Sequence, residues 1–266
     1  MSKVVTLESH SVIAHNDSES HENKIHSDDV AQQYGFEGAL VPGVTVIGHI
    51  MRVPVAGWGE RIFTGTRANV RLLKPTYHQD RLTISGSVSG GTMQVECHND
   101  SGVLLAPMTL ETWNGDLAPI TSIGKRPVSA KAEIATKNLH VGLATPEFTT
   151  TPDLETHLDL CELLGDTNSL YFDGTTPCVH PLWTFRELNS AFTRTWTMPV
   201  WIHVGTEITW IHPIRVGDEV AINMTPLTQW ERKGHEFTTL GVTLRVGNTV
   251  CIDARHTAIY NAAKRT

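Results

Sequence analysis

One order of elements occurs twice in this chain of 266 residues, and this repeat constrains the fold more than any single motif. Residues 73–82 align with residues 211–220 at an offset of 138 positions, which brings a proline and an aspartate of each segment into register. At the same offset, Pro42-Gly43-Val44 aligns with His180-Pro181-Leu182, and each opens an apolar run typical of a buried helix. The chain is therefore predicted to contain two copies of one helix-plus-sheet unit.

Strand signals follow the first apolar helix, which begins at about residue 44. Pro54 and Gly57-Trp58-Gly59 predict the end of that helix. Apolar and polar residues then alternate, as in antiparallel strands with one buried face, and Gly90-Gly91 predicts a hairpin turn. The strands predicted in the first half are residues 66–73, which alternate in part and are ended by Pro75, and residues 81–88, 92–97, 103–106 and 108–113.

The middle of the chain has the composition of a linker. Residues 115–132 are rich in Gly, Pro, Ser and Lys and show no periodicity. We therefore predict an N-terminal unit at 1–114, a linker at 115–132 and a C-terminal unit at 133–266. A hydrophobic content of 40% and a charged content of 18% are those of a globular chain with a substantial core.

The charge of the chain argues against two classes of partner. The net charge is −7 and no Lys/Arg cluster occurs, so neither a nucleic acid nor an anionic membrane surface is expected as the main partner. The N-terminus lacks an apolar run of signal-peptide length, and no segment approaches the ~20 apolar residues of a membrane span. We expect a soluble, cytoplasmic protein.

Cysteines and histidines do not indicate a metal site. The four cysteines are far apart and are interpreted as small buried hydrophobic residues: Cys97, Cys161, Cys178 and Cys251. The spacing of His10, His15, His21 and His26 does not place them on one helix face, so no metal is predicted. No phosphate loop, Gly-x-Ser-x-Gly elbow or dinucleotide fingerprint occurs, so no cofactor is implied and a Ser or Cys nucleophile has no support.

The most chemically suggestive stretch lies near the N-terminus. Asn23 and His26 are three residues apart, and a polar run and a Gly-rich turn then lead to Pro42-Gly43 at the start of the first apolar helix. From spacing alone, Asn23 could be a helix cap and His26 a surface residue. The alternative is that Asn23 and His26 form a functional pair.

This arrangement resembles the signature of the MaoC-like (R)-specific enoyl thioester hydratases of the hotdog superfamily. That signature is Gly-Asp-x-Asn-Pro-(Ile/Leu)-His, followed sixteen residues later by the opening of the central helix. Asn23, Ile25 and His26 match it, and Pro42-Gly43 lies at the helix opening. The chain departs from it at the Asp, which is His21 here, and at the Pro, which is Lys24.

The second copy keeps a different part of the same signature. Residues 165–171 fit it except for Ser at the Pro and Tyr at the His, and the interval to the helix opening at His180 is shorter. A second, degenerate site is therefore predicted, with the residues Asp166, Asn168, Tyr171 and His180.

The resemblance implies an α+β double hotdog, in which each half wraps a sheet around a helix and the two sheets join edge to edge. It also implies that His26 is the general acid/base and that Asn23 positions it. The acid that replaces the family's Asp stays open: Glu22, His21 or Asp28 could serve, or Asp166 could reach across the interface, and Glu22 or no replacement is favoured. The residues expected to bind the substrate at the helix opening are Val41, Pro42, Gly43 and Val44, with the Gly43 or Val44 N–H polarising the thioester carbonyl.

Two stretches of the second half carry further candidates. Residues 201–210 alternate as a strand, which predicts that His203 and Glu207 share one face. That face could line the substrate pocket, or it could be the wet side of the sheet. Arg186, Glu187 and Asn189 lie within the second apolar helix, and we interpret them as its solvent-facing side.

By resemblance, the predicted function is a cofactor-independent hydro-lyase of fatty acid metabolism, acting on an α,β-unsaturated or β-hydroxy acyl thioester or a related small carbonyl compound. The expected partner is a small substrate carried by CoA or a carrier protein, and a homodimer or higher homo-oligomer is expected. A thioesterase or a cyclase/isomerase that reuses the pocket is one alternative, and a non-catalytic acyl-binding protein is another.

Overall fold

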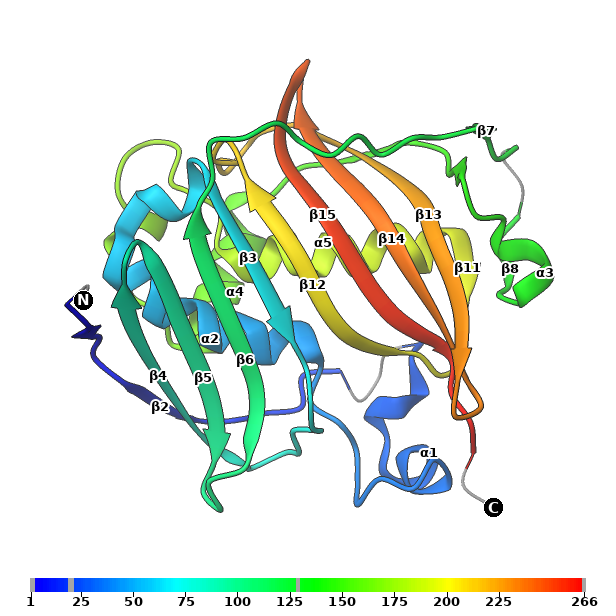
Figure 1. Ribbon diagram of the computed structural model, residues 1–266, viewed down its shortest axis with the longest axis horizontal. Helices are drawn as coiled ribbons and strands as arrows, with labels where there is room; N and C mark the ends of the chain where they lie inside the picture. Colours follow the sequence, from blue (N-terminus) through cyan, green and yellow to red (C-terminus); the bar gives the residue numbers. More distant parts are fainter. Residues whose placement is uncertain (1–2, 19–21, 128–129, 265–266) are drawn as a thin grey trace.

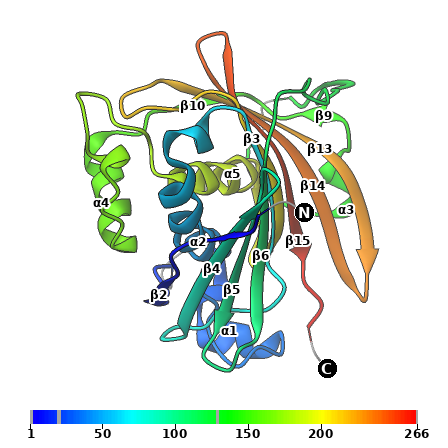
Figure 2. The same cartoon turned by 60° about the vertical axis from the view of Figure 1, so that its left-hand side comes forward.

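Two central helices lie side by side against one face of a large sheet. The computed structural model describes residues 3–18, 22–127 and 130–264, and within them the sheet has eleven strands paired antiparallel. The helices are α2 (Gly43–Trp58) and α5 (Pro181–Thr195), and the curved sheet wraps around them (Figures 1 and 2). Each half contributes one helix and about half of the sheet.

The two half-sheets join at β3 (Thr66–Arg71) and β12 (Ile202–Trp210), which pair over six positions. A Cβ atom at Gly205 would lie 2.8 Å from the Val70 carbonyl oxygen, so this close pairing requires glycine there. The join covers an edge of each half-sheet. The other strands are, on one side of the join, β6 (Leu104–Thr112), β5 (Thr92–Asn99), β4 (Arg81–Ser89), β1 (Val5–Thr6) and β2 (His10–Ile13), and on the other side β15 (Thr249–Asn261), β14 (His235–Val246), β13 (Val220–Arg232) and β10 (Phe148–Thr150).

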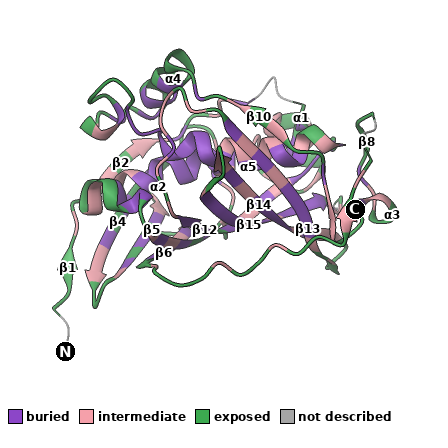
Figure 3. Cartoon of the chain, turned by 90° about the horizontal axis from the view of Figure 1, so that it is seen from above, coloured by how far each residue is buried: buried purple, intermediate pink, exposed green. Residues whose placement is uncertain are grey.

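Short elements complete the two units. The segment after β6 crosses to the second half along the outside of the molecule, where β7 pairs with β9 and β8 with β11 (Figures 1 and 3). Helix α4 lies outside the central pair, with an exposed outer face (Figures 2 and 3). The remaining bounds are η1 (Lys24–His26), α1 (Asp28–Gln33), η2 (Gly59–Phe63), β7 (Gly124–Lys125), β8 (Ala132–Glu133), α3 (Thr136–Leu139), β9 (Leu143–Ala144), α4 (Leu154–Leu164), η3 (Ser169–Tyr171) and β11 (Trp196–Thr197).

The internal repeat recurs in the hydrogen bonds. An isolated antiparallel bridge joins Leu40 to Tyr77 in the first half and Cys178 to Arg215 in the second, at the same offset of 138 positions. In each bridge the second residue donates its N–H to an aspartate carboxylate three positions later, at 2.8 Å. The predicted duplication of a helix-plus-sheet unit is confirmed.

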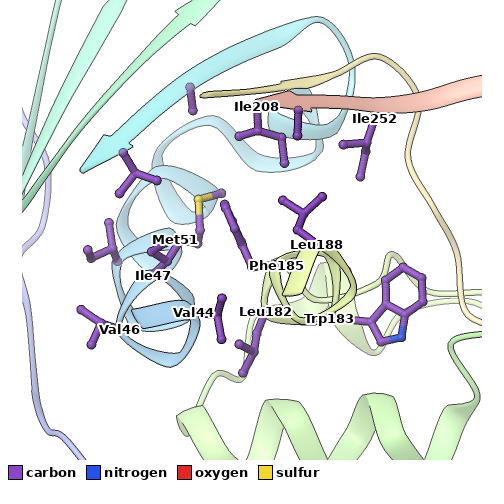
Figure 4. Packing of buried hydrophobic residues seen from close by; sticks show 14 of the residues in the cluster. Val44, Val46, Ile47, Met51, Leu182, Trp183, Phe185, Leu188, Ile208 and Ile252 are labelled. Atoms are coloured by element: carbon purple, nitrogen blue, oxygen red, sulfur yellow. The ribbon is translucent and has the colours of Figure 1, made fainter. Parts of the chain in front are cut away.

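The core lies between the two helices and the sheet. Val44 and Met51 of α2 face Phe185 and Leu188 of α5, and apolar residues of the sheet close the cluster (Figure 4). Eleven of the sixteen residues of α2 are buried, as expected for a helix that is apolar on nearly all sides. All four cysteines are free and buried, as predicted.

One boundary prediction is confirmed and another needs correction. Helix α2 continues through Pro54 to Trp58 and ends at the predicted Gly57-Trp58-Gly59 turn, where Gly59 has a φ of +61° that suits glycine. The strands predicted at 103–106 and 108–113 form one strand, β6. Among the described residues, no helix combines the length and the apolar character that crossing a membrane would need.

Candidate functional site

Asn23 fixes the loop that carries His26 onto the second half of the chain. Its Oδ1 accepts the Trp201 N–H at 3.2 Å, and its Nδ2 donates to the Trp201 carbonyl at 2.9 Å. The same Oδ1 caps η1 by accepting the Ile25 N–H at 3.5 Å. Because one buried amide satisfies backbone groups of both segments, the His26 loop has a defined position next to β12.

The His26 ring is oriented by the Leu40 carbonyl oxygen, which lies 2.7 Å from Nδ1. A carbonyl oxygen only accepts, so Nδ1 carries the proton and Nε2 carries the lone pair in the neutral ring. Nε2 lies 3.4 Å from the Asn23 Nδ2 atom, and Asn16 donates its Nδ2 proton to the His26 carbonyl at 2.8 Å. This tautomer is the one that a general base acting through Nε2 needs.

Two adjoining cavities meet at His26. The apolar cavity has a volume of about 230 Å³ and is walled mainly by aliphatic and aromatic residues of both halves. The polar cavity, of about 530 Å³, is lined largely by charged and polar side chains of the N-terminal segment and of α5. The residues common to both are Asn23, His26, Pro42, Asn189 and Trp201.

The start of helix α2 lies at the junction of the two cavities. Val41 and Gly43 line the apolar cavity, Val44 lines the polar one, and no side chain caps this helix. The first N–H groups of a helix have no partner within it, so those of Gly43 and Val44 are suited to an anionic oxygen. A Cβ atom at Gly43 would lie 2.3 Å from Leu72 Cδ1 and 3.5 Å from His203 Nδ1, so glycine keeps this corner open.

His203 lines the apolar cavity next to Gly43. The residue is 6% exposed, and burial lowers its pKa to about 4, so the ring is neutral. Its Nε2 lies 2.8 Å from the Thr206 hydroxyl, which lies 2.9 Å from Nδ1 of His256, whose ring stacks on that of His203. Within the described residues His203 Nδ1 has no hydrogen-bond partner, so this nitrogen is available to a ligand in the cavity.

The prediction that His203 and Glu207 share a face is wrong. The register of β12 against β15 shifts between His203 and Gly205, and this bulge reverses the alternation. Thr206 is therefore buried, whereas Glu207 is exposed and lines hollows on the outer face with Arg71. Glu207 lines neither of the two cavities at His26.

The structure separates the predicted acids. Glu22 lines the polar cavity, but its side chain is largely exposed and forms an ion pair with Lys131 at 2.8 Å. Asp28 begins helix α1 and accepts the Ala39 N–H at 2.7 Å, and it lines neither cavity. His21 lies outside the described residues.

The predicted residues of the second half lie close together, but they pack on one another and do not surround either of the two cavities at His26. Asp166 Oδ2 lies 3.5 Å from His180 Nε2, and the Tyr171 ring packs on the His180 ring with centroids 4.6 Å apart. His157, which sequence reasoning did not select, donates to the Tyr171 carbonyl at 2.8 Å. None of these residues lines the two cavities at His26, so Asp166 does not reach across to the first site.

Two residues of α5 were interpreted as solvent-facing but lie in the site. Glu187 and Asn189 both line the polar cavity, and Asn189 also lines the apolar one. Their Oε2 and Oδ1 atoms are fully covered and have no partner among the described residues. Burial raises the Glu187 pKa, although Arg194 acts in the opposite direction.

Within the described residues, no group of three or more His, Cys, Asp or Glu side chains is arranged to hold a metal ion. The site can therefore offer three kinds of group: a basic imidazole, helix N–H donors and a partly buried carboxyl. These are the groups used in acid–base chemistry next to a carbonyl.

Comparisons with known proteins identify the fold. No family model matches the sequence, and no curated protein matches it. Among solved structures, a protein of Chloroflexus aurantiacus J-10-fl assigned as a MaoC domain dehydratase matches with a TM-score of 0.70 and 13% identity, covering 100% of this chain and 96% of that one.

Two further structures agree with this one. Rv0216 of Mycobacterium tuberculosis, described as a double hotdog fold, matches with a TM-score of 0.66 and 11% identity over 97% of this chain and 96% of its own. A protein of Lactobacillus plantarum assigned as an oleoyl thioesterase matches with a TM-score of 0.53 and 9% identity over 98% of both chains. At such identities the likeness concerns the fold alone, and this chain has the double hotdog fold of MaoC-like dehydratases.

Proposed function

We propose that this protein is a hydro-lyase that adds water to, or removes it from, the α and β carbons of an acyl thioester. The main support is the His26 ring, whose Nδ1 is held by the Leu40 carbonyl so that Nε2 is basic at the junction of an apolar and a polar cavity. Hydration needs this combination, because an apolar acyl chain and a water molecule must meet at one base.

The start of helix α2 would bind the thioester carbonyl. The N–H groups of Gly43 and Val44 point away from the helix and can donate to the oxygen on which negative charge develops as water adds. His203 Nδ1 lies next to Gly43 and would supply a further polar contact from a neutral ring. The acyl group would extend into the apolar cavity, whose volume of about 230 Å³ suits a short chain.

Replacing His26 tests this proposal. With a panel of enoyl thioesters, His26→Ala is expected to lower the hydration rate by ~10²- to 10⁴-fold, the usual contribution of a positioned acid/base group. The melting temperature should change little, because the hydrogen bonds of the ring to the Leu40 carbonyl and to the Asn23 amide each contribute modestly to stability. The control is His98→Ala, a partly exposed histidine next to Glu96. Full activity of the His26 variant would disprove the assignment.

The same panel distinguishes the alternative functions. Release of free thiol from saturated acyl thioesters would indicate a thioesterase. Stabilisation by ligand without turnover, of the size that mass action predicts, would indicate a binding protein.

A further inference from the structure

We propose that Glu187, on helix α5 of the second half, is the acid that works opposite His26 of the first half. This inference rests on the proposed function and supplies the partner that hydration requires. Water can add only if one group takes a proton from the water and another delivers a proton to the α carbon. His26 accounts for the first of these transfers.

The loop that carries His26 offers no buried carboxyl to the cavities among the described residues. Glu22 has an exposed side chain paired with Lys131, and Asp28 holds the Ala39 N–H. An exposed carboxyl remains ionised near neutral pH and is a poor proton donor. Among the residues that the structure describes, the candidate acid is therefore sought on another element.

Glu187 lies in the same cavity as His26, and its surroundings favour the protonated carboxyl that a proton donor needs. It lines the polar cavity together with His26, and its Oε2 atom is fully covered without a hydrogen-bond partner among the described residues. A carboxyl that lines a cavity and has an oxygen without a hydrogen-bond partner is suited to carry a proton and to release it to a bound molecule. Burial also raises the pKa of this carboxyl, which favours the protonated form needed for hydration.

The neighbours of Glu187 on α5 are anchored to the first half. Arg186 pairs with Asp17 at 2.6 Å, and the same carboxylate accepts the Thr45 hydroxyl of α2 at 3.2 Å. These contacts use the Asp17 oxygens, whereas Glu187 Oε2 has no partner among the described residues. Asn189, two positions further along the same helix, lines both cavities together with His26.

The proton balance is complete without a further reactant. His26 Nε2 takes a proton from water while the water oxygen bonds to the β carbon and the Cα–Cβ π electrons move toward the thioester carbonyl. The α carbon then takes the proton from the Glu187 carboxyl as the carbonyl re-forms. His26 ends as imidazolium and Glu187 as carboxylate, and transfer of one proton from the first to the second through solvent restores the site. Dehydration is the reverse.

Glu187→Gln tests the assignment, because glutamine keeps the shape of the side chain but cannot deliver the proton. Hydration of an enoyl thioester such as crotonyl-CoA should fall by ~10²-fold or more. Exchange of the α proton of the β-hydroxyacyl product with deuterated water should be lost as well, which a merely structural role would not produce in a folded variant. Glu187→Asp should recover part of the rate. Glu162→Gln, at an exposed glutamate of α4, is the matched control and should retain the wild-type rate.

The pH profile gives a second readout that needs no variant. The wild-type hydration rate should fall at alkaline pH as Glu187 loses its proton, and a rate that stays flat throughout the alkaline range in which the protein remains folded would overturn the proposal. The titratable and charged groups that share the cavity with Glu187 are Asp17, Glu22, His26, Lys131, Arg186 and Arg194. Of the two carboxyls among them, Asp17 is paired and Glu22 is exposed, so neither is expected to produce this alkaline limb.

The outcomes separate the two proposals. A Glu187→Gln variant that retains hydration and α-proton exchange, while His26→Ala is inactive, would overturn the assignment of Glu187 alone. Full activity of His26→Ala, or no hydration by the wild-type protein, would overturn the proposed function and the role of Glu187 together. If Glu187→Gln does not fold, the wild-type pH profile decides.

Discussion

The two halves of this chain build the same helical turn in front of the same kind of helix, yet among the described residues the turn of the first half adjoins two cavities and that of the second half adjoins neither of them. Asn23 caps η1 through the Ile25 N–H, and Asn168 caps η3 through the Leu170 N–H. In both halves the helix that follows begins close to this turn. The difference lies in the side chains that surround the turn.

The start of the central helix is closed in one half and open in the other. His180 caps α5 by accepting the Leu182 N–H on its Nδ1 at 3.0 Å, whereas Pro42 at the corresponding position of α2 has no side chain that could cap the helix. The Tyr171 ring packs on the His180 ring at a tilt of 49°, so this pair of rings occupies the place that corresponds to His26. A helix start becomes a binding site only when its N–H groups are left without an internal acceptor.

Duplication therefore supplied two scaffolds with different uses. In the second half, the buried polar residues Asp166, Tyr171 and His180 pack on one another and line neither cavity at His26. In the first half, a neutral His203 and an oriented His26 line the cavities, and Glu187 of α5 lines the polar one, which suits a binding role. The second half nevertheless contributes to the first site through Trp201, His203 and α5.

Among the variants that test the difference between the two helix starts, the largest loss of turnover is expected at the start of α2. Gly43→Ala should lower turnover by ~10-fold or more, because the new Cβ would fill the space between the helix N–H groups, Leu72 and His203. The free energy of unfolding should fall by only ~1–2 kcal/mol, since the Leu72 side chain can move. Pro181→Ala, at the corresponding position of α5, should leave turnover within about twofold. Equal losses from both variants, measured by steady-state kinetics, would contradict the assignment of one open helix start.

A smaller effect on turnover and a larger one on stability are expected at Asp166. Burial alone would raise the Asp166 pKa, but the hydrogen bonds from His180 and from the Asn168 N–H outweigh it, and the pKa is lowered. Asp166→Asn should therefore cost ~1–3 kcal/mol of unfolding free energy at pH 7 while turnover stays within about threefold.

The pH dependence of that loss has a definite sign. A carboxyl whose pKa is lowered by folding contributes stability above its unfolded pKa of ~3.9, and this contribution disappears as the pH falls through the folded pKa. Urea titrations of the wild type and of Asp166→Asn should thus converge below about pH 4. Asp173→Asn, at an exposed site of the same half, should show no such difference. If the difference in unfolding free energy between the wild type and Asp166→Asn were the same at all pH values, Asp166 would not be a buried carboxylate.

The smallest effect is expected at Asp28. Asp28→Asn retains an oxygen that can accept the Ala39 N–H, so turnover should stay within about twofold and the free energy of unfolding within ~1 kcal/mol. Turnover assays and thermal melts of the purified variant measure both quantities. A loss of ~10²-fold in turnover would indicate that Asp28 is the acid.

Much of the fold was predictable because local sequence patterns indicate it. Alternation identified β4 and β5, the glycine pair marked their hairpin, and the offset of 138 positions identified the duplication. Packing overrode one local signal, since Pro54 was accommodated inside α2, whose neighbouring residues are buried on nearly all sides.

The candidate site was predictable only in part. Asn23 and His26 could be selected because both lie on one short loop with a recognisable spacing. The bulge at His203 could not be foreseen, since a one-residue shift depends on how β12 pairs with β15. Thr206 and His256 are 50 positions apart, and no local pattern links them. Glu187 was read as a solvent-facing residue because its helix is amphipathic by pattern.

The sequence by itself determined the duplicated architecture, the position of the His26 loop before the central helix, and the absence of a carboxyl at the usual position in that loop. Those properties follow from spacing and from residue types along a continuous stretch. The tertiary structure alone decided which half keeps an open helix start and which carboxyls share a cavity with His26. The reason is physical: whether a polar group is paired, covered or available depends on atoms brought together from distant segments. Glu187 acquires its proposed role only because α5 of one half packs against the loop of the other.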